Sequence, residues 1–232
     1  MRSALFLFLT TIFFHTAAFA QTADSSWCRA NVAPRINVVP TTETVRYDFA
    51  QSKKQLDTFK IDTENPYGSN VITDVGGLMK GGIETKQNAS YGIISNPNTD
   101  QTCMWISEIS VGIKISPLIY IASEYPRGTC EHKAIMEHEN KHVEVDRQLV
   151  NAYAQLMGQE YFRLLQQKPL YGPFPTAQKD AYAQHINTES VNIFNALVQR
   201  MEAERKLRQQ QVDNINEYES VQAKCPNGRF AH

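Results

Sequence analysis

An uninterrupted helical pattern runs from Cys130 to Gln167, and it constrains the fold more than any other stretch. Apolar residues recur along it at helical spacing, and no proline occurs before Lys168-Pro169. Thr129 is the expected N-cap, and Glu131 suits the positive end of the helix dipole. We therefore expect one long helix that begins after Thr129.

A second helical pattern follows a short, proline-rich connector over residues 170–175. Thr176 is expected to cap this helix, which continues to about Ala223. Two long helices joined by a short connector pack antiparallel. Residues 129–223 are therefore predicted to form a helical hairpin.

The part of the chain before the helices, residues 35–122, is rich in strand signals. The clearest pattern alternates apolar and polar residues over 103–115 and resumes over 118–122, and we expect these two strands to pair antiparallel across a turn near Pro117. Strands followed by helices predict an α+β fold, with residues 21–232 as a single domain.

Residues 1–20 have the pattern of a secretory signal peptide. Arg2 precedes an apolar run over residues 4–14, and Ala18-Phe19-Ala20 resembles a cleavage site. The apolar run is shorter than the roughly 20 residues of a membrane span, and no later segment is apolar enough to span one. We expect an exported protein, which in a bacterium would be periplasmic or extracellular.

Four cysteines follow the signal peptide, and an even number in an exported chain predicts two disulfides. Three connectivities are possible. If the strands meet at Pro117, Cys103 lies opposite the neighbourhood of Cys130, so we favour Cys103–Cys130. Cys28–Cys225 would then join the two ends of the mature chain.

The first long helix carries His138-Glu139-x-x-His142, the H-E-x-x-H pattern of zinc metallopeptidases. Residues four apart lie on one face of a helix, so the two imidazoles can share one Zn²⁺. The alternative is a pair of inert core histidines. In a peptidase the metal lowers the pKa of a water molecule to about 7, and Glu139 accepts the proton from that water as the general base.

Zinc also needs a third protein ligand. With the connector centred near residues 171–172, residue 140 faces the region of residue 203 on the second helix. Glu204 lies there on the inward face, so we rank it first. Asp146 is about 12 Å along the helix from His138, and Glu160 about 27 Å from His142, so both rank lower.

Hydrolysis further requires a hydrogen-bond donor for the developing oxyanion. Three side chains are candidates from the sequence: His132, Tyr182 and His185.

The segment from Cys130 to Val143, after a strand containing Met104-Trp105-Ile106, resembles a family of exported bacterial proteins predicted to be zinc-dependent proteases (DUF922). The resemblance covers roughly residues 44–220 and is specific around residues 130–143. It implies a bacterial, periplasmic location, with His138 and His142 as zinc ligands and Glu139 as base.

These observations predict an exported zinc metallopeptidase that acts on a peptide, a protein or a cell-wall peptide. The alternative is a binding or structural protein whose histidine pair is zinc-stabilised or inert. The formal net charge of −1 argues against a nucleic-acid partner.

Overall fold

The computed structural model describes residues 26–60, 63–68 and 76–225, so the expected signal peptide lies outside the described residues. None of the described helices combines the length and the apolar character needed to cross a membrane. The elements, in chain order, are β1 (Arg35–Thr42), β2 (Arg46–Asp48), α1 (Lys53–Leu56), β3 (Gly77–Lys80), β4 (Ile83–Asn96), β5 (Gln101–Ile115), β6 (Leu118–Ile121), α2 (Cys130–Gln167), β7 (Tyr171–Pro175), a 3₁₀ turn η1 (Thr176–Gln178), α3 (Lys179–Val212) and α4 (Ile215–Ala223).

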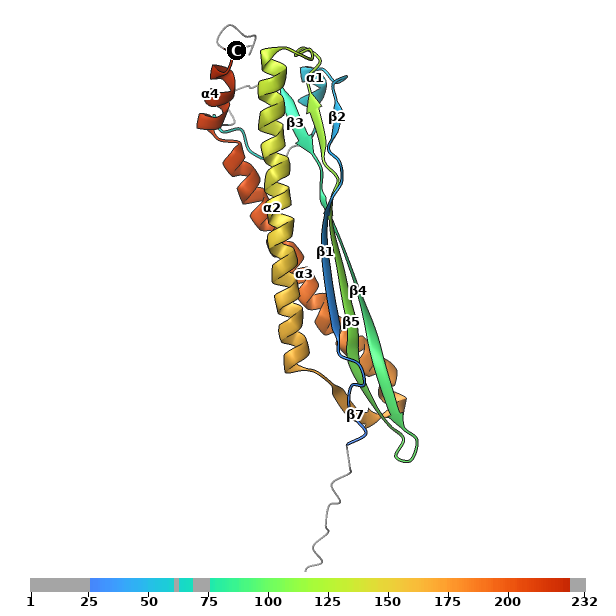
Figure 1. Cartoon of the computed structure of the whole chain (residues 1–232). Helices are drawn as coiled ribbons and strands as arrows, with labels where there is room; N and C mark the ends of the chain where they lie inside the picture. The colour runs from blue at the N-terminus through green and yellow to red at the C-terminus, as the bar shows by residue number, and fades with distance from the viewer. Residues whose placement is uncertain (1–25, 61–62, 69–75, 226–232) are drawn as a thin grey trace, which may run out of the picture.

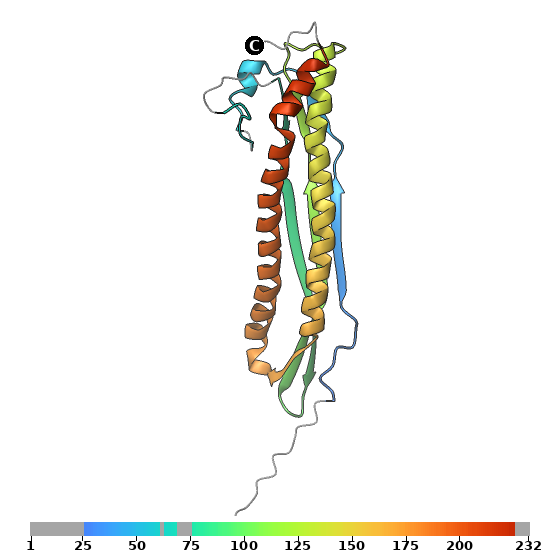
Figure 2. The same ribbon diagram turned by 90° about the vertical axis from the view of Figure 1, so that its left-hand side faces the viewer.

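The predicted α+β fold and the antiparallel pair of long helices are confirmed. Figures 1 and 2 show an elongated molecule in which α2 and α3 lie along one face of a long sheet. That sheet has the order β1-β5-β4, with β1 parallel and β4 antiparallel to β5, and β7 also pairs with β5. Its main core fills the space between the layers, with Ile109 and Ile113 from β5, Leu149 and Met157 from α2, and Ile186 and Met201 from α3.

The predicted pairing of the two strands around Pro117 is wrong. Strand β6 belongs to a separate three-stranded sheet, parallel to β2 and antiparallel to β3. Strand β5 already has partners on both edges, so its ladder has no place for β6. Proline lacks a backbone N–H but suits extended backbone, so Pro117 interrupts the strand without reversing the chain.

The predicted disulfide connectivity is wrong for the same reason. The bonds are Cys28–Cys103 and Cys130–Cys225. Because β5 and β6 run on in one direction, the start of β5, which carries Cys103, and the start of α2, which carries Cys130, lie at opposite ends of the molecule (Figure 1). Cys103 therefore bonds to Cys28, from the N-terminal part of the chain, and Cys130 bonds to Cys225, from the C-terminal part.

The second helix is also divided where one helix was predicted. Its first residues form η1, and it stops at Val212 before α4 begins at Ile215. Asn214 makes the restart: its backbone is extended, and its side-chain oxygen accepts a hydrogen bond from the backbone N–H of Glu217 at 3.0 Å. The break places Asp213 between the two helices.

Candidate metal centre

Helix α2 brings the two histidines of the motif together. The Thr129 hydroxyl fixes the start of the helix by accepting a hydrogen bond from the backbone N–H of His132 at 3.2 Å. His138 and His142 follow on one face, and their Nε2 atoms are 3.3 Å apart. Both side chains are buried. Two nitrogen donors therefore converge on one point inside the protein.

Asp213 completes a group of three donors. It is the residue after α3, and its Oδ1 atom lies 3.2 Å from Nε2 of His138 and 3.2 Å from Nε2 of His142. Asp213 is 6 % exposed, and a carboxylate this buried needs a cation or hydrogen-bond donors beside it. These three side chains can hold a metal ion between them.

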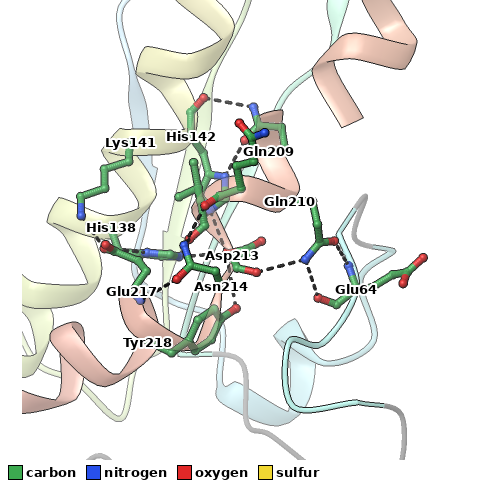
Figure 3. A network of polar contacts seen from close by, with 12 residues as sticks. Glu64, His138, Lys141, His142, Gln209, Gln210, Asp213, Asn214, Glu217 and Tyr218 are labelled. Atoms are coloured by element: carbon green, nitrogen blue, oxygen red, sulfur yellow. Dashed lines mark hydrogen bonds and ion pairs between the residues drawn. The ribbon is translucent and has the colours of Figure 1, made fainter. Parts of the chain in front are cut away.

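Each imidazole is oriented through its other nitrogen. Nδ1 of His142 faces Oε1 of Gln209 at 2.5 Å, and Nδ1 of His138 faces Oε1 of Glu217 at 3.4 Å (Figure 3). Because a carboxylate and an amide oxygen only accept hydrogen bonds, Nδ1 is the protonated nitrogen of each ring. The neutral form of each ring then presents a free lone pair at Nε2, toward Asp213.

Gln209 is itself held by a buried ion pair. Its amide nitrogen donates to the backbone carbonyl of His142 at 3.1 Å and to Oδ1 of Asp146 at 2.8 Å. Asp146 is fully buried and accepts from Nε and Nη2 of Arg205 at 2.8 and 3.0 Å. Asp146, a candidate ligand from the sequence, thus lies one layer behind His142 and supports it through Gln209.

Glu139 lies against strand β3. The side chain is 4 % exposed and accepts a hydrogen bond from the backbone N–H of Met79. A Cβ atom at Gly77 would lie 2.3 Å from Cγ2 of Ile135 and 2.8 Å from Oε1 of Glu139, so only glycine leaves room for both side chains. Burial raises its pKa, and the charges of His138 and His142 oppose this shift. Glu139 is therefore held next to the three donors but is not one of them.

The protonation states of His138, His142 and Asp213 depend on one another. Burial alone would lower the pKa of His142, but its hydrogen bond with Asp213 and the charge of Glu139 outweigh burial and raise the pKa to about 9. The same balance, with the Asp213 hydrogen bond opposing burial, raises the pKa of His138. Burial would raise the pKa of Asp213, but hydrogen bonds from the two histidines hold it well below its usual range. When no metal ion is bound, these pKa shifts favour protonated imidazoles that face an ionised Asp213.

The carboxylate ranked first from the sequence, Glu204, is not brought to the histidines. It accepts a hydrogen bond from the Tyr153 hydroxyl at 2.8 Å and pairs with Arg208. Glu160, the other alternative, pairs with Arg163 at 2.9 Å on its own helix. Both carboxylates have other cationic or hydroxyl partners.

The register of α2 against α3 explains why Glu204 does not face the histidines. The predicted register places Met201 opposite His142, whereas Gln209 lies there, eight residues further along α3. Strand β7 and the turn η1 lengthen the connector, so the hairpin turns later than residues 171–172. In the actual register each step of four residues on α2 matches a step of four on α3: His138 with Asp213, His142 with Gln209, and Asp146 with Arg205.

The three side chains suggested as oxyanion donors lie elsewhere. Nδ1 of His132 is 3.0 Å from the carbonyl of Tyr125. Tyr182 stacks on Phe174, and His185 is an exposed neighbour of Glu189 near the connector end.

Sequence reasoning missed Asp213 because it treated residues 176–223 as one helix. The signal that was present is Asp213-Asn214, two residues that favour helix caps, followed by Glu217 three residues after the cap. Comparisons with protein-family profiles, with curated proteins and with solved structures found no match to this chain, so its function must be argued from the site itself.

Proposed function

We propose that the His138, His142 and Asp213 side chains bind Zn²⁺. Zinc–ligand bonds of about 2.0–2.1 Å at tetrahedral angles put neighbouring donor atoms roughly 3.3–3.4 Å apart. The three donor atoms here are 3.2, 3.2 and 3.3 Å apart. This near-equilateral triangle is the single observation that carries the proposal. Two nitrogens, one carboxylate oxygen and a fourth position open to water are typical of catalytic zinc sites.

We further propose that the protein is a metallopeptidase. A bound zinc ion would polarise a carbonyl group and lower the pKa of a water molecule. The charges of His138 and His142 act on the Glu139 carboxylate. This supports Glu139 as the base that would accept a proton from the water and pass it to the leaving amine. The peptide class of the substrate, whether a protein or a cell-wall peptide, is supported by the H-E-x-x-H spacing.

An exported, periplasmic location accords with two features of the chain. All four cysteines are in disulfides, which persist in oxidising compartments. The first 20 residues have the composition of a cleaved signal peptide.

The first test is metal content. Purified mature protein, dialysed without chelator, should hold about one zinc ion per chain by mass spectrometry of the metal. His138→Ala and Asp213→Ala should abolish this zinc. Glu204→Ala is the matched control: it removes a carboxylate from α3, away from the histidines, and it should keep the metal. A zinc-free wild-type protein, or zinc retained in Asp213→Ala, would contradict the assignment.

The second test is hydrolysis of fluorescein-labelled casein and of a cross-linked cell-wall peptide. Glu139→Gln should keep zinc and lose hydrolysis by a factor of about 10²–10⁴, because only the base is removed. Retained hydrolysis in Glu139→Gln would contradict the proposed mechanism.

A zinc-stabilised structural role is the second candidate, favoured by the burial of the site. His138, Glu139, His142 and Asp213 are each less than a tenth exposed. A wild-type protein that holds zinc, unfolds at lower temperature with a chelator and hydrolyses neither substrate would support this role instead.

A further inference from the structure

A tyrosine from α4 lies against the metal centre. The ring of Tyr218 packs on His138, with centroids 5.6 Å apart, and on Tyr67, with centroids 6.2 Å apart. Its hydroxyl is directed to Oδ1 of Asp213, at 3.4 Å (Figure 3). Oδ1 is the same oxygen that faces both imidazoles. The phenol is therefore held between two rings, and its hydroxyl lies beside the donor triangle, the three metal-binding atoms of His138, His142 and Asp213.

Peptide hydrolysis builds negative charge on the carbonyl oxygen of the substrate, and a fixed hydrogen-bond donor stabilises that charge. Most uncharged hydrogen-bond donors near these three atoms already donate to other acceptors. The Gln209 amide nitrogen donates to His142 and Asp146, and the Asn214 amide nitrogen donates to the carbonyl of Gln211. Tyr218 differs, because among the described residues its hydroxyl makes a single long hydrogen bond, to an oxygen that a metal ion would share.

We propose that the Tyr218 hydroxyl is a catalytic hydrogen-bond donor, which stabilises the oxyanion formed from the substrate carbonyl. The inference rests on the proposed peptidase function. When Oδ1 of Asp213 binds a cation, it becomes a weaker acceptor, and the hydroxyl is then available to the substrate oxygen. The proton stays on the phenol throughout, so the step is a hydrogen bond and requires no further reactant.

The competing role for Tyr218 is to position Asp213 through the same hydrogen bond. The two roles differ in what the loss of the hydroxyl changes. A positioning hydroxyl affects zinc retention, whereas an oxyanion donor affects kcat and the binding of oxyanion mimics but leaves zinc in place.

The test compares the zinc-loaded wild type with Tyr218→Phe, with Tyr182→Phe as the matched control. Tyr182 also carries a phenol, but it lies on α3 and stacks on Phe174 of β7, which is at the end of the molecule opposite α4 (Figure 1). For Tyr218→Phe, we expect full zinc content, a KM within about 2-fold, and a kcat on a quenched fluorogenic peptide about 10²-fold lower. We also expect acetohydroxamate to bind about 10-fold more weakly, since a hydrogen bond to its charged oxygen is lost. The control should match the wild type in all four measurements.

An unchanged kcat and acetohydroxamate affinity in Tyr218→Phe, with an active wild type, would overturn the role of Tyr218 alone. Loss of zinc in this variant would also overturn it, in favour of positioning. A wild type that holds zinc but hydrolyses no peptide would overturn the peptidase proposal and this role with it.

Discussion

The disulfide between Cys130 and Cys225 should matter for metal binding as well as for stability. It ties the first residue of α2 to the segment that follows α4. Helix α4 has no buried residue of its own, yet it supplies Glu217, which orients His138. Replacing both cysteines by serine should therefore release α4 and weaken the support of His138.

The other disulfide, Cys28–Cys103, provides a matched control. The two bonds close loops of 95 and 75 residues, worth about 4.7 and 4.5 kcal/mol in the chain-entropy account. Removing either pair should thus destabilise the protein by nearly the same amount. Cys103 lies near the start of β5, beside β7, and these strands are at the opposite end of the molecule from α4 (Figure 1), so loss of Cys28–Cys103 should leave His138, His142 and Asp213 in place.

Zinc affinity then separates the two variants. Loss of a partner that orients a ligand costs roughly 10–100-fold in metal affinity, and we expect this for Cys130→Ser/Cys225→Ser only. The assay is competition with a chromophoric chelator at a temperature where circular dichroism shows both variants folded. Glu217→Gln should weaken zinc binding in the same direction with little loss of stability. Equal zinc affinity in the two double variants would refute the reasoning.

Three further predictions concern the surroundings of the donors. Gln209→Leu removes the acceptor at Nδ1 of His142 and should lower zinc affinity about 10–100-fold, as measured by chelator competition; unchanged affinity would contradict this role. Gly77→Ala places a Cβ 2.3 Å from Cγ2 of Ile135 and 2.8 Å from Oε1 of Glu139, and it should cost about 1–3 kcal/mol in urea unfolding as well as lower kcat, whereas Gly112→Ala, with no atom within 4 Å, should do neither. In the metal-free protein the pKa of His142 is about 9, above its unfolded value of about 6.5; its contribution to stability should be fully present below pH 6.5 and lost as pH rises through 9, and urea unfolding with chelator at pH 6 and 9.5 that shows no such loss would contradict it.

Local pattern was sufficient for the parts of the site that lie on one helix. The spacing of His138 and His142 fixes their common face wherever α2 lies, and the same period predicts the helix itself. The third donor depends on two tertiary features, the length of the connector and the break after Val212. A helix break costs backbone hydrogen bonds, so sequence reasoning favours continuity unless packing and caps are known.

The strands show the same division between local and tertiary information. The alternation of apolar and polar residues predicts the strand β5, but it does not indicate which strands pair with either edge of β5. Because β1 and β4 occupy both edges of β5, β6 had to find partners in another sheet. The cysteine pairing depended on that choice, so a single wrong strand pairing produced a wrong disulfide pattern.

The length of the connector between α2 and α3 sets the register of the two helices at a metal centre that the connector does not contact. From His142 to the end of α2 the helix rises roughly 38 Å. The number of residues in the connector at that end determines which residue of α3 faces the His142 imidazole. One residue inserted at the start of α3 would turn every later side chain by about 100° and move Asp213 away from the histidines. Changes in length at residues 168–178 should therefore be as damaging to metal binding as substitution of a ligand. Insertions at the tip between β4 and β5, at the same end of the molecule, leave the register of the helices intact and should be tolerated.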